Sequence, residues 1–393
     1  MTQPARPYIG GQAVLEGVMM RAPTSFAVVV RRRDGSLQVR ERAMVSARRG
    51  VARWPLVRGV ASLVESLRLG SEALRFSAEL MEKDLVVQDE ADRIAATKAA
   101  NASKTGGAGL GVLASLGLAL FAAATAEDGA PVQSAGGARK LGTWIMLAVA
   151  ITFFVALPQG AAAGLNRLAG FGLEVQSAAF QAITGAFKLT IVVGYLLAIR
   201  RVPDIRRVFQ YHGAEHKTIS TYEAGEALTV DNARRKTTLH PRCGTTFLVM
   251  VALVSILVFT AIGAFLPRIH SGSALLDNVA FFAEKLPFLP FIVAATFEIQ
   301  RVFARYCTTG PLRMLLWPGF LVQKITTAEP DDAQLEVALG SLRVTLFRAG
   351  ADQEARHADG ADGANAADKG DVSFPTYEAL LTADRLRQVA QAA

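Results

Sequence analysis

Apolar residues are concentrated in five long runs in the central part of the chain, at 110–126, 141–158, 179–199, 246–267 and 286–299. The run 246–267 contains no charged residue and, as a helix, is long enough to cross the roughly 30 Å hydrocarbon core of a bilayer. The other runs are shorter or contain a charge such as Lys188 or Glu298, so a buried or interfacial helix is the alternative for each of them. The pattern therefore predicts a polytopic α-helical membrane protein.

The first fifty residues have a different pattern, which is typical of β-structure. Phe26–Arg33 and Ser36–Arg42 flank Asp34-Gly35, a dipeptide that favours a tight hairpin turn. The segment Met1–Arg21 lacks the continuous apolar core of a signal peptide, so we expect it to belong to the folded protein. The predicted fold class is mainly α, with a small N-terminal β-hairpin element.

Amphipathic and polar stretches set the remaining expected boundaries. Residues 55–81 interleave charged side chains with Val, Leu and Phe, which predicts an amphipathic helix, whereas 83–108 has the composition of a linker. Residues 348–371 have little to bury and are expected to be disordered. The expected units are a cytoplasmic β element (1–50), the amphipathic helix and linker (51–108), first membrane segments (109–199), a cytoplasmic metal-site region (200–245), second membrane segments (246–325), a cytoplasmic helix (326–347) and an acidic tail with a short terminal helix (348–393).

The chain is basic as well as apolar, with 42 Lys and Arg against 34 Asp and Glu and with 51% hydrophobic residues. Arginines precede the first apolar run and follow the third, and the positive-inside rule places both regions in the cytoplasm. Three complete spans between them would separate the two regions, so we expect one of them, 179–199 with Lys188, not to cross. The expected partner is the lipid bilayer, and no nucleic acid is expected.

The candidate chemistry lies in two short motifs, His212-Gly-Ala-Glu215-His216 and His240-Pro-Arg-Cys243-Gly244. On a helix, the two histidines of the first motif lie one turn apart on the same face, with the glutamate beside them. This H-x-x-E-H spacing is that of inverted zinc peptidases, in which the histidines bind zinc and the glutamate is the general base. The second motif has the shape of a zinc knuckle, a tight turn that presents two ligands. Together they predict a divalent-metal site with Zn²⁺ as the expected cofactor.

The number of ligands separates the two main functional hypotheses. Four ligands, His212, His216, His240 and Cys243, would complete a tetrahedral structural site, as expected of a non-catalytic assembly or scaffold protein. Three ligands, the first two histidines and either His240 or Cys243, would leave a position for water, with Glu215 as the base. The leading hypothesis is therefore a metal-dependent hydrolase, and the scaffold is the alternative. A transporter is a weaker third, because few charges lie within the apolar runs.

Three further carboxylates are candidate additional ligands: Glu16, Glu223 and Glu226. Each has a simpler interpretation, because such side chains are more often solvated or paired with a nearby basic residue. A cytoplasmic site suits Cys243, since a reducing cytosol leaves its thiolate free to bind metal, and two cysteines give no disulfide framework.

Four blocks of the sequence complete this picture: Gly10–Arg21, Tyr211–Thr218, Leu239–Thr245 and Thr326–Asp332. In this order they resemble the YqhQ-like family of bacterial membrane proteins, predicted metal-dependent enzymes of unknown function. The resemblance covers most of residues 8–347 and implies a multi-span protein of the inner membrane with the two ligand blocks at its centre. It implies no substrate. The chain departs from the family in 99–140 and after Arg348, so no function is assigned to those parts.

Overall fold

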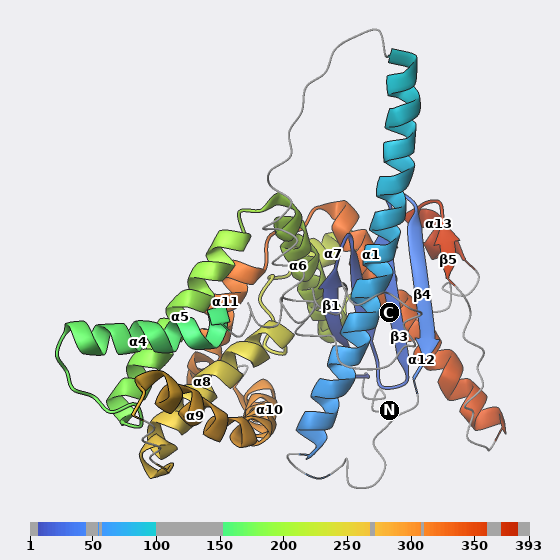
Figure 1. Cartoon of the computed structure of the whole chain (residues 1–393). Helices are drawn as coiled ribbons and strands as arrows, with labels where there is room; N and C mark the ends of the chain where they lie inside the picture. Colours follow the sequence, from blue (N-terminus) through green and yellow to red (C-terminus); the bar gives the residue numbers. More distant parts are fainter. Residues whose placement is uncertain are drawn as a thin grey trace.

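The structure, a computed structural model, describes residues 7–44, 54, 57–99, 152–267, 272–307, 310–359 and 371–383. Within these residues the protein is mainly helical, with one antiparallel sheet, as predicted. The α-helices are α1 (Val57–Ala99), α4 (Leu157–Leu168), α5 (Ala178–Ile199), α6 (Pro203–Ala224), α7 (Val230–Arg234), α8 (Gly244–Ile262), α9 (Ala274–Lys285), α10 (Leu289–Tyr306), α11 (Trp317–Thr326), α12 (Asp332–Asp359) and α13 (Tyr377–Thr382). Figure 1 shows the apolar helices α4, α5, α8, α9 and α10 gathered on one side of the molecule and the sheet, α1 and α12 on the other.

The sheet has five strands in the order β1-β2-β3-β4-β5, each antiparallel to the next: β1 (Gly10–Val14), β2 (Gly17–Arg21), β3 (Ser25–Arg31), β4 (Leu37–Ala43) and β5 (Val372–Phe374). The predicted hairpin corresponds to β3 and β4, and Gly35 in its turn has a φ of 87°, which glycine adopts without strain. The sheet is larger than the hairpin alone. The pattern missed β1 and β2 because three glycines weaken the strand propensity of that segment, and tertiary pairing overrides this.

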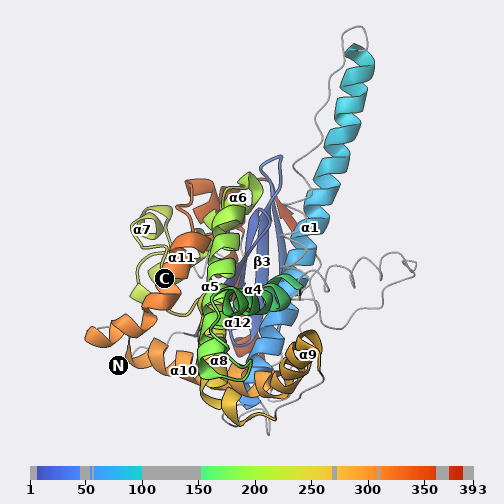
Figure 2. The same ribbon diagram turned by 60° about the vertical axis from the view of Figure 1, so that its left-hand side comes forward.

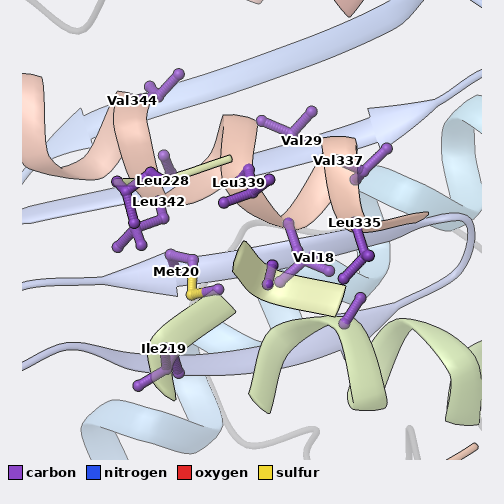
Figure 3. Close-up of a cluster of buried hydrophobic side chains, with 14 of the residues drawn as sticks. Val18, Met20, Val29, Ile219, Leu228, Leu335, Val337, Leu339, Leu342 and Val344 are labelled. Carbon is purple, nitrogen blue, oxygen red and sulfur yellow. The ribbon is translucent and has the colours of Figure 1, made fainter. Parts of the chain in front are cut away.

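Both faces of the sheet are covered, which explains why β3 is apolar at consecutive positions (Figures 1 and 2). On one face, Phe76 and its neighbours from α1 pack with Phe26 and Val28 of the sheet. On the other face, α12 and α6 pack against the sheet, and Figure 3 shows Leu339 of α12 close to Val29 of β3. A strand that is buried on both faces has no polar side to alternate with the apolar one.

Two helices are longer than the sequence pattern indicated. α1 continues through the segment expected to be a linker as far as Ala99, and Figure 1 shows its C-terminal part extending away from the body of the molecule. α12 continues past the expected end at Phe347 to Asp359. Each extension contains four alanines, the residue with the highest intrinsic helix propensity, and this favours the helical conformation there.

The C-terminal residues dock onto the sheet. β5 pairs with β4, and Arg40 donates from Nε and Nη2 to the two carboxylate oxygens of Asp371 at 2.7 and 2.9 Å. The short terminal helix that we expected is α13, whose Tyr377 and Leu380 are buried in the cluster between α12 and the sheet. The tail is therefore part of the fold at 371–383.

Three helical segments among the described residues are long and apolar enough to cross a membrane: Ala178–Ile199, Gly244–Ile262 and Val279–Phe303. The first two are α5 and α8, and the third combines the end of α9, the 3-10 turn η4 (Leu286–Phe288) and α10. Large apolar side chains on these helices are exposed, such as Leu257 on α8 and Phe291 on α10, as expected of a lipid-facing surface. The run 179–199, which we expected not to cross, meets the length and composition of a span, whereas 110–126 and most of 141–158 lie outside the described residues.

A bidentate ion pair joins the two parts of the molecule. Arg58, near the start of α1, donates from Nε and Nη2 to the carboxylate of Glu298 on α10 at 2.7 and 2.5 Å. A carboxylate in an apolar segment is costly without a partner, and the arginine fork satisfies both of its oxygens. The sheet layer is thereby fixed to the end of a candidate span.

Candidate metal centre

Helix α6 carries the first motif and is bounded by clear start and stop residues. Pro203 and Asp204 occupy its first turn, and Gly225 ends it with a φ of 74°. Gly213 allows a close approach to the segment after α11, because a Cβ at this position would lie 2.1 Å from the carbonyl oxygen of Ala328. The helix is thus held against the 326–328 segment on the side that bears the motif.

The structure brings His212, His216 and Cys243 together as a cluster that could hold a metal ion. Nitrogen and sulfur atoms of these three residues all lie within 4.8 Å of one another, and all three residues are buried. His212 Nε2 lies 3.1 Å from Cys243 Sγ, and the two imidazole rings meet edge to face with their centroids 4.4 Å apart. Cys243 occupies the N-cap position of α8, where the helix dipole favours a thiolate.

Backbone carbonyls orient both imidazole rings. His212 Nδ1 is 2.9 Å from the carbonyl oxygen of Thr326, and His216 Nδ1 is 2.5 Å from that of Thr238. A carbonyl can only accept a hydrogen bond, so each Nδ1 carries a proton and Nε2 is the nitrogen that each ring can offer to a metal. His216 Nε2 is buried without a hydrogen-bond partner. This arrangement suits metal ligation, because a ligating histidine commonly donates its other N–H to such an outer group.

Glu215 lies between the two histidines in sequence and faces β1. A Cβ at Gly11 would lie 2.7 Å from its Cγ and Oε1, so only glycine leaves room for the carboxylate at this point of the strand. The backbone N–H of Ala13 hydrogen-bonds to the carboxylate, while Oε2 is buried without a partner. Burial raises the pKa of Glu215, although His212 and His216 oppose the shift. The group is a buried carboxylate with one oxygen free to take a proton.

The thiol and the nearest imidazole form a charge pair. Burial disfavours the thiolate of Cys243, but the two histidines outweigh it and hold the pKa of the thiol well below its usual value. Burial also disfavours the imidazolium of His212, but the charge and hydrogen bond of Cys243 raise its pKa to about 9. The thiolate is already a deprotonated donor, whereas His212 holds a proton that a divalent ion would displace on binding.

His240 lies beside the cluster and outside it. Its ring centroid is 5.7 Å from that of His216, but its Nε2 is 3.3 Å from a carboxylate oxygen of Glu223. Gln323 hydrogen-bonds to both the N–H and the carbonyl of His240, each at 2.8 Å, which fixes the backbone of the knuckle. Burial raises the pKa of Glu223, but His240 and Arg242 more than offset this, and the net shift is downward.

The other two candidate carboxylates are held in ion pairs. Glu16, at the turn between β1 and β2, accepts hydrogen bonds from Nε and Nη2 of Arg207 at 2.5 Å and from the hydroxyl of Tyr211 at 3.1 Å. Glu226 pairs with Lys236. The hydrogen bond from Tyr211 ties the β1–β2 turn to α6 one residue before His212.

The motif analysis missed the groups that support the cluster. These are Gly11 and Ala13 of β1, the carbonyls of Thr238 and Thr326, and Gln323 of α11. Gly11 and Ala13 belong to the block Gly10–Arg21 and Thr326 to the block Thr326–Asp332, both of which carry the family resemblance, so that signal was in the sequence. Their roles depend on backbone atoms, which side-chain chemistry does not indicate.

Fold and site together define a mainly helical protein with three candidate membrane spans and a His/His/Cys cluster suited to a metal. The chain belongs to the family described as "Protein of unknown function (DUF1385)", whose model matches residues 54–347. It is 29% identical over 343 residues to "Uncharacterized protein YqhQ" of Bacillus subtilis (strain 168), which covers 86% of this chain and 92% of the relative. The expected family is confirmed. No solved structure matches the chain.

Proposed function

We propose that the protein is a metal-dependent hydrolase of the membrane in which His212, His216 and Cys243 hold a zinc ion. The observation that carries the proposal is the orientation of the two rings, since both Nδ1 atoms donate to carbonyls and both Nε2 atoms are left for the cluster. With His240 engaged by Glu223, three protein ligands are available. A three-ligand zinc site keeps a position for water, as catalytic sites do.

In this proposal the three ligands and Glu215 have different roles. His212, His216 and Cys243 would hold the zinc ion, which would supply the Lewis acidity that activates a water molecule. Glu215 takes a proton at Oε2, which is buried next to the cluster and free of other partners. Its burial raises the pKa of the carboxyl, which makes the carboxylate a stronger base. The Ala13 N–H and the glycine at position 11 keep the carboxylate beside the histidines.

The assignment of three ligands is tested by comparing Cys243→Ala with His240→Ala. We expect Cys243→Ala to lose the metal and the ability to rescue a strain that lacks this gene, because it removes a direct donor. His240→Ala should retain both, since its ring contacts Glu223. Elemental analysis of the purified variants and growth of the rescued strains are the measurements. Metal loss in both variants, with growth kept at saturating zinc, would favour the closed site of a scaffold protein.

We further propose that the metal centre faces the cytoplasm and that α5 crosses the bilayer. Arg200, Arg201 and Arg206 follow α5 directly, where the positive-inside rule places them in the cytoplasm. A crossing α5 puts the loop before it on the opposite side of the membrane.

Single reporter cysteines test this orientation. The native Cys243 and Cys307 are buried, so we expect them not to react with the labelling reagent. In intact cells, Arg235→Cys should resist a membrane-impermeant maleimide, whereas Glu174→Cys, in the loop before α5, should react. Lysis should make both positions reactive. Protection of Glu174→Cys in intact cells would show that α5 stays on one side, and reaction of Arg235→Cys would reverse the orientation.

A further inference from the structure

A surface groove lies along α11. It has a volume of about 260 Å³ and is lined by Leu239, Arg313, Trp317, Phe320, Leu321 and Lys324. The lining is almost entirely apolar, yet it includes two cationic side chains and no acidic one. Arg313 lies over the ring of Phe320, with its guanidinium carbon 5.8 Å from the ring centroid.

The groove lies where two candidate spans end. Nη1 of Arg200, the residue after α5, donates to the carbonyl oxygen of Lys324 at 2.6 Å. Gly319 packs against the first turn of α8, since a Cβ added there would lie 2.2 Å from Cγ2 of Thr246. The end of α5 and the start of α8 therefore both meet α11. In a bilayer, this is the level at which hydrocarbon gives way to headgroups.

The exposed residues around the groove have the composition of a headgroup-level surface. Trp317 is 55% exposed, and Leu312 and Met314 of the preceding 3-10 turn η5 (Pro311–Leu316) are 53% and 73% exposed. Tryptophan is enriched at membrane interfaces, where its ring is apolar and its N–H meets water. Basic side chains at the same level attract anionic lipids.

We propose that this groove is a binding site for a phospholipid with an anionic headgroup. The phosphate is held by Arg313 and Lys324, and an acyl chain lies along Trp317, Phe320 and Leu321. A soluble phosphate compound would leave the apolar floor unused. A phospholipid with a zwitterionic headgroup would offer the two cations no net charge. An anionic phospholipid matches both features of the lining.

The site would couple the bilayer to the metal centre through one helix. Thr326 on α11 accepts the hydrogen bond from His212 Nδ1, and Gln323 on the same helix holds the backbone of His240. Leu239, which lines the groove, directly precedes His240. The bound lipid thus lies against the helix that orients a candidate ligand. The lipid site does not depend on whether the metal is catalytic.

Native mass spectrometry of the full chain in detergent, titrated with dioleoyl phosphatidylglycerol or dioleoyl phosphatidylcholine, tests the proposal. We expect one phosphatidylglycerol to be retained per chain, with about tenfold preference over phosphatidylcholine. The double variant Arg313→Gln/Lys324→Gln should lose this preference, and Phe320→Ala should weaken retention of both lipids. Equal retention of the two lipids by the unaltered chain would overturn the proposal.

The matched control is Arg201→Gln/Arg206→Gln, which removes the same charge from exposed positions on the same side of the spans. This control should keep the preference for phosphatidylglycerol. If it loses the preference to the same extent, the preference arises from general surface charge and not from the groove. Glycerol 3-phosphate at millimolar concentration should not displace the lipid. Displacement would indicate a site for free phosphate compounds and would contradict the lipid assignment. Unchanged melting temperatures of the variants exclude unfolding. If Arg313→Gln/Lys324→Gln does unfold, Lys324→Gln alone should reduce the preference for phosphatidylglycerol by half or more.

Discussion

Replacing Glu215 with glutamine should leave the metal content of the purified protein unchanged and abolish its ability to rescue a strain that lacks the gene. Glutamine has the volume of glutamate and can still accept the hydrogen bond from the Ala13 N–H, so the packing against Gly11 is preserved. It has no basic oxygen to take a proton at the position of Oε2. Loss of a general base slows a reaction by about 10² to 10⁴-fold.

The matched control is Glu223→Gln, which removes a carboxylate that contacts His240 and lies outside the His/His/Cys cluster. This variant should keep both metal and rescue. If the Glu215→Gln strain grows at the same rate as the strain with the unaltered protein, Glu215 is not a general base. Loss of metal in that variant would instead make Glu215 part of the metal shell.

Replacing His216 with alanine should reduce the bound metal from about one ion per chain to a trace, because two donors cannot retain a divalent ion against purification. The unaltered protein should also melt at a lower temperature after treatment with a chelator, since ion binding stabilises only the folded state. In His216→Ala, the chelator should have no effect on melting. Elemental analysis and melting curves with and without chelator measure both effects.

His357→Ala is the control for a general effect of removing a histidine, because this residue belongs to α12 and to neither of the two motifs. It should retain the metal and the response to chelator. A full complement of metal in His216→Ala would contradict the assignment of this residue as a ligand. His212→Ala should behave as His216→Ala does, since its Nε2 faces Cys243.

Local spacing in the sequence was enough to predict the centre of the candidate site. His212 and His216 are one helical turn apart, and this places both rings on one face whatever the rest of the fold does. Cys243 could be named as a donor from its chemistry. The sequence could not show that Cys243, and not His240, lies in the cluster. That depends on the contacts of His240 with Glu223 and Gln323.

The supporting contacts required the three-dimensional structure because they join distant residues through backbone atoms. The carbonyl that orients His212 comes from Thr326, 114 residues later in the chain. The strand that confines Glu215 begins with two glycines, whose sequence pattern favours a turn. Hydrophobic periodicity could locate α5, α8 and the sheet hairpin, but strand pairing beyond the hairpin is a tertiary effect that propensity does not encode.

Each edge of the sheet is engaged over part of its length. β5 pairs with the first three residues of β4, and the carboxylate of Glu215 engages the N–H of Ala13 on β1. An exposed edge would offer its unpaired amides and carbonyls to any extended chain, including another copy of the same sheet. A peptide that added a strand beside Ala13 would have to displace the carboxylate of Glu215, so strand addition at this edge would compete with the role that we propose for this residue.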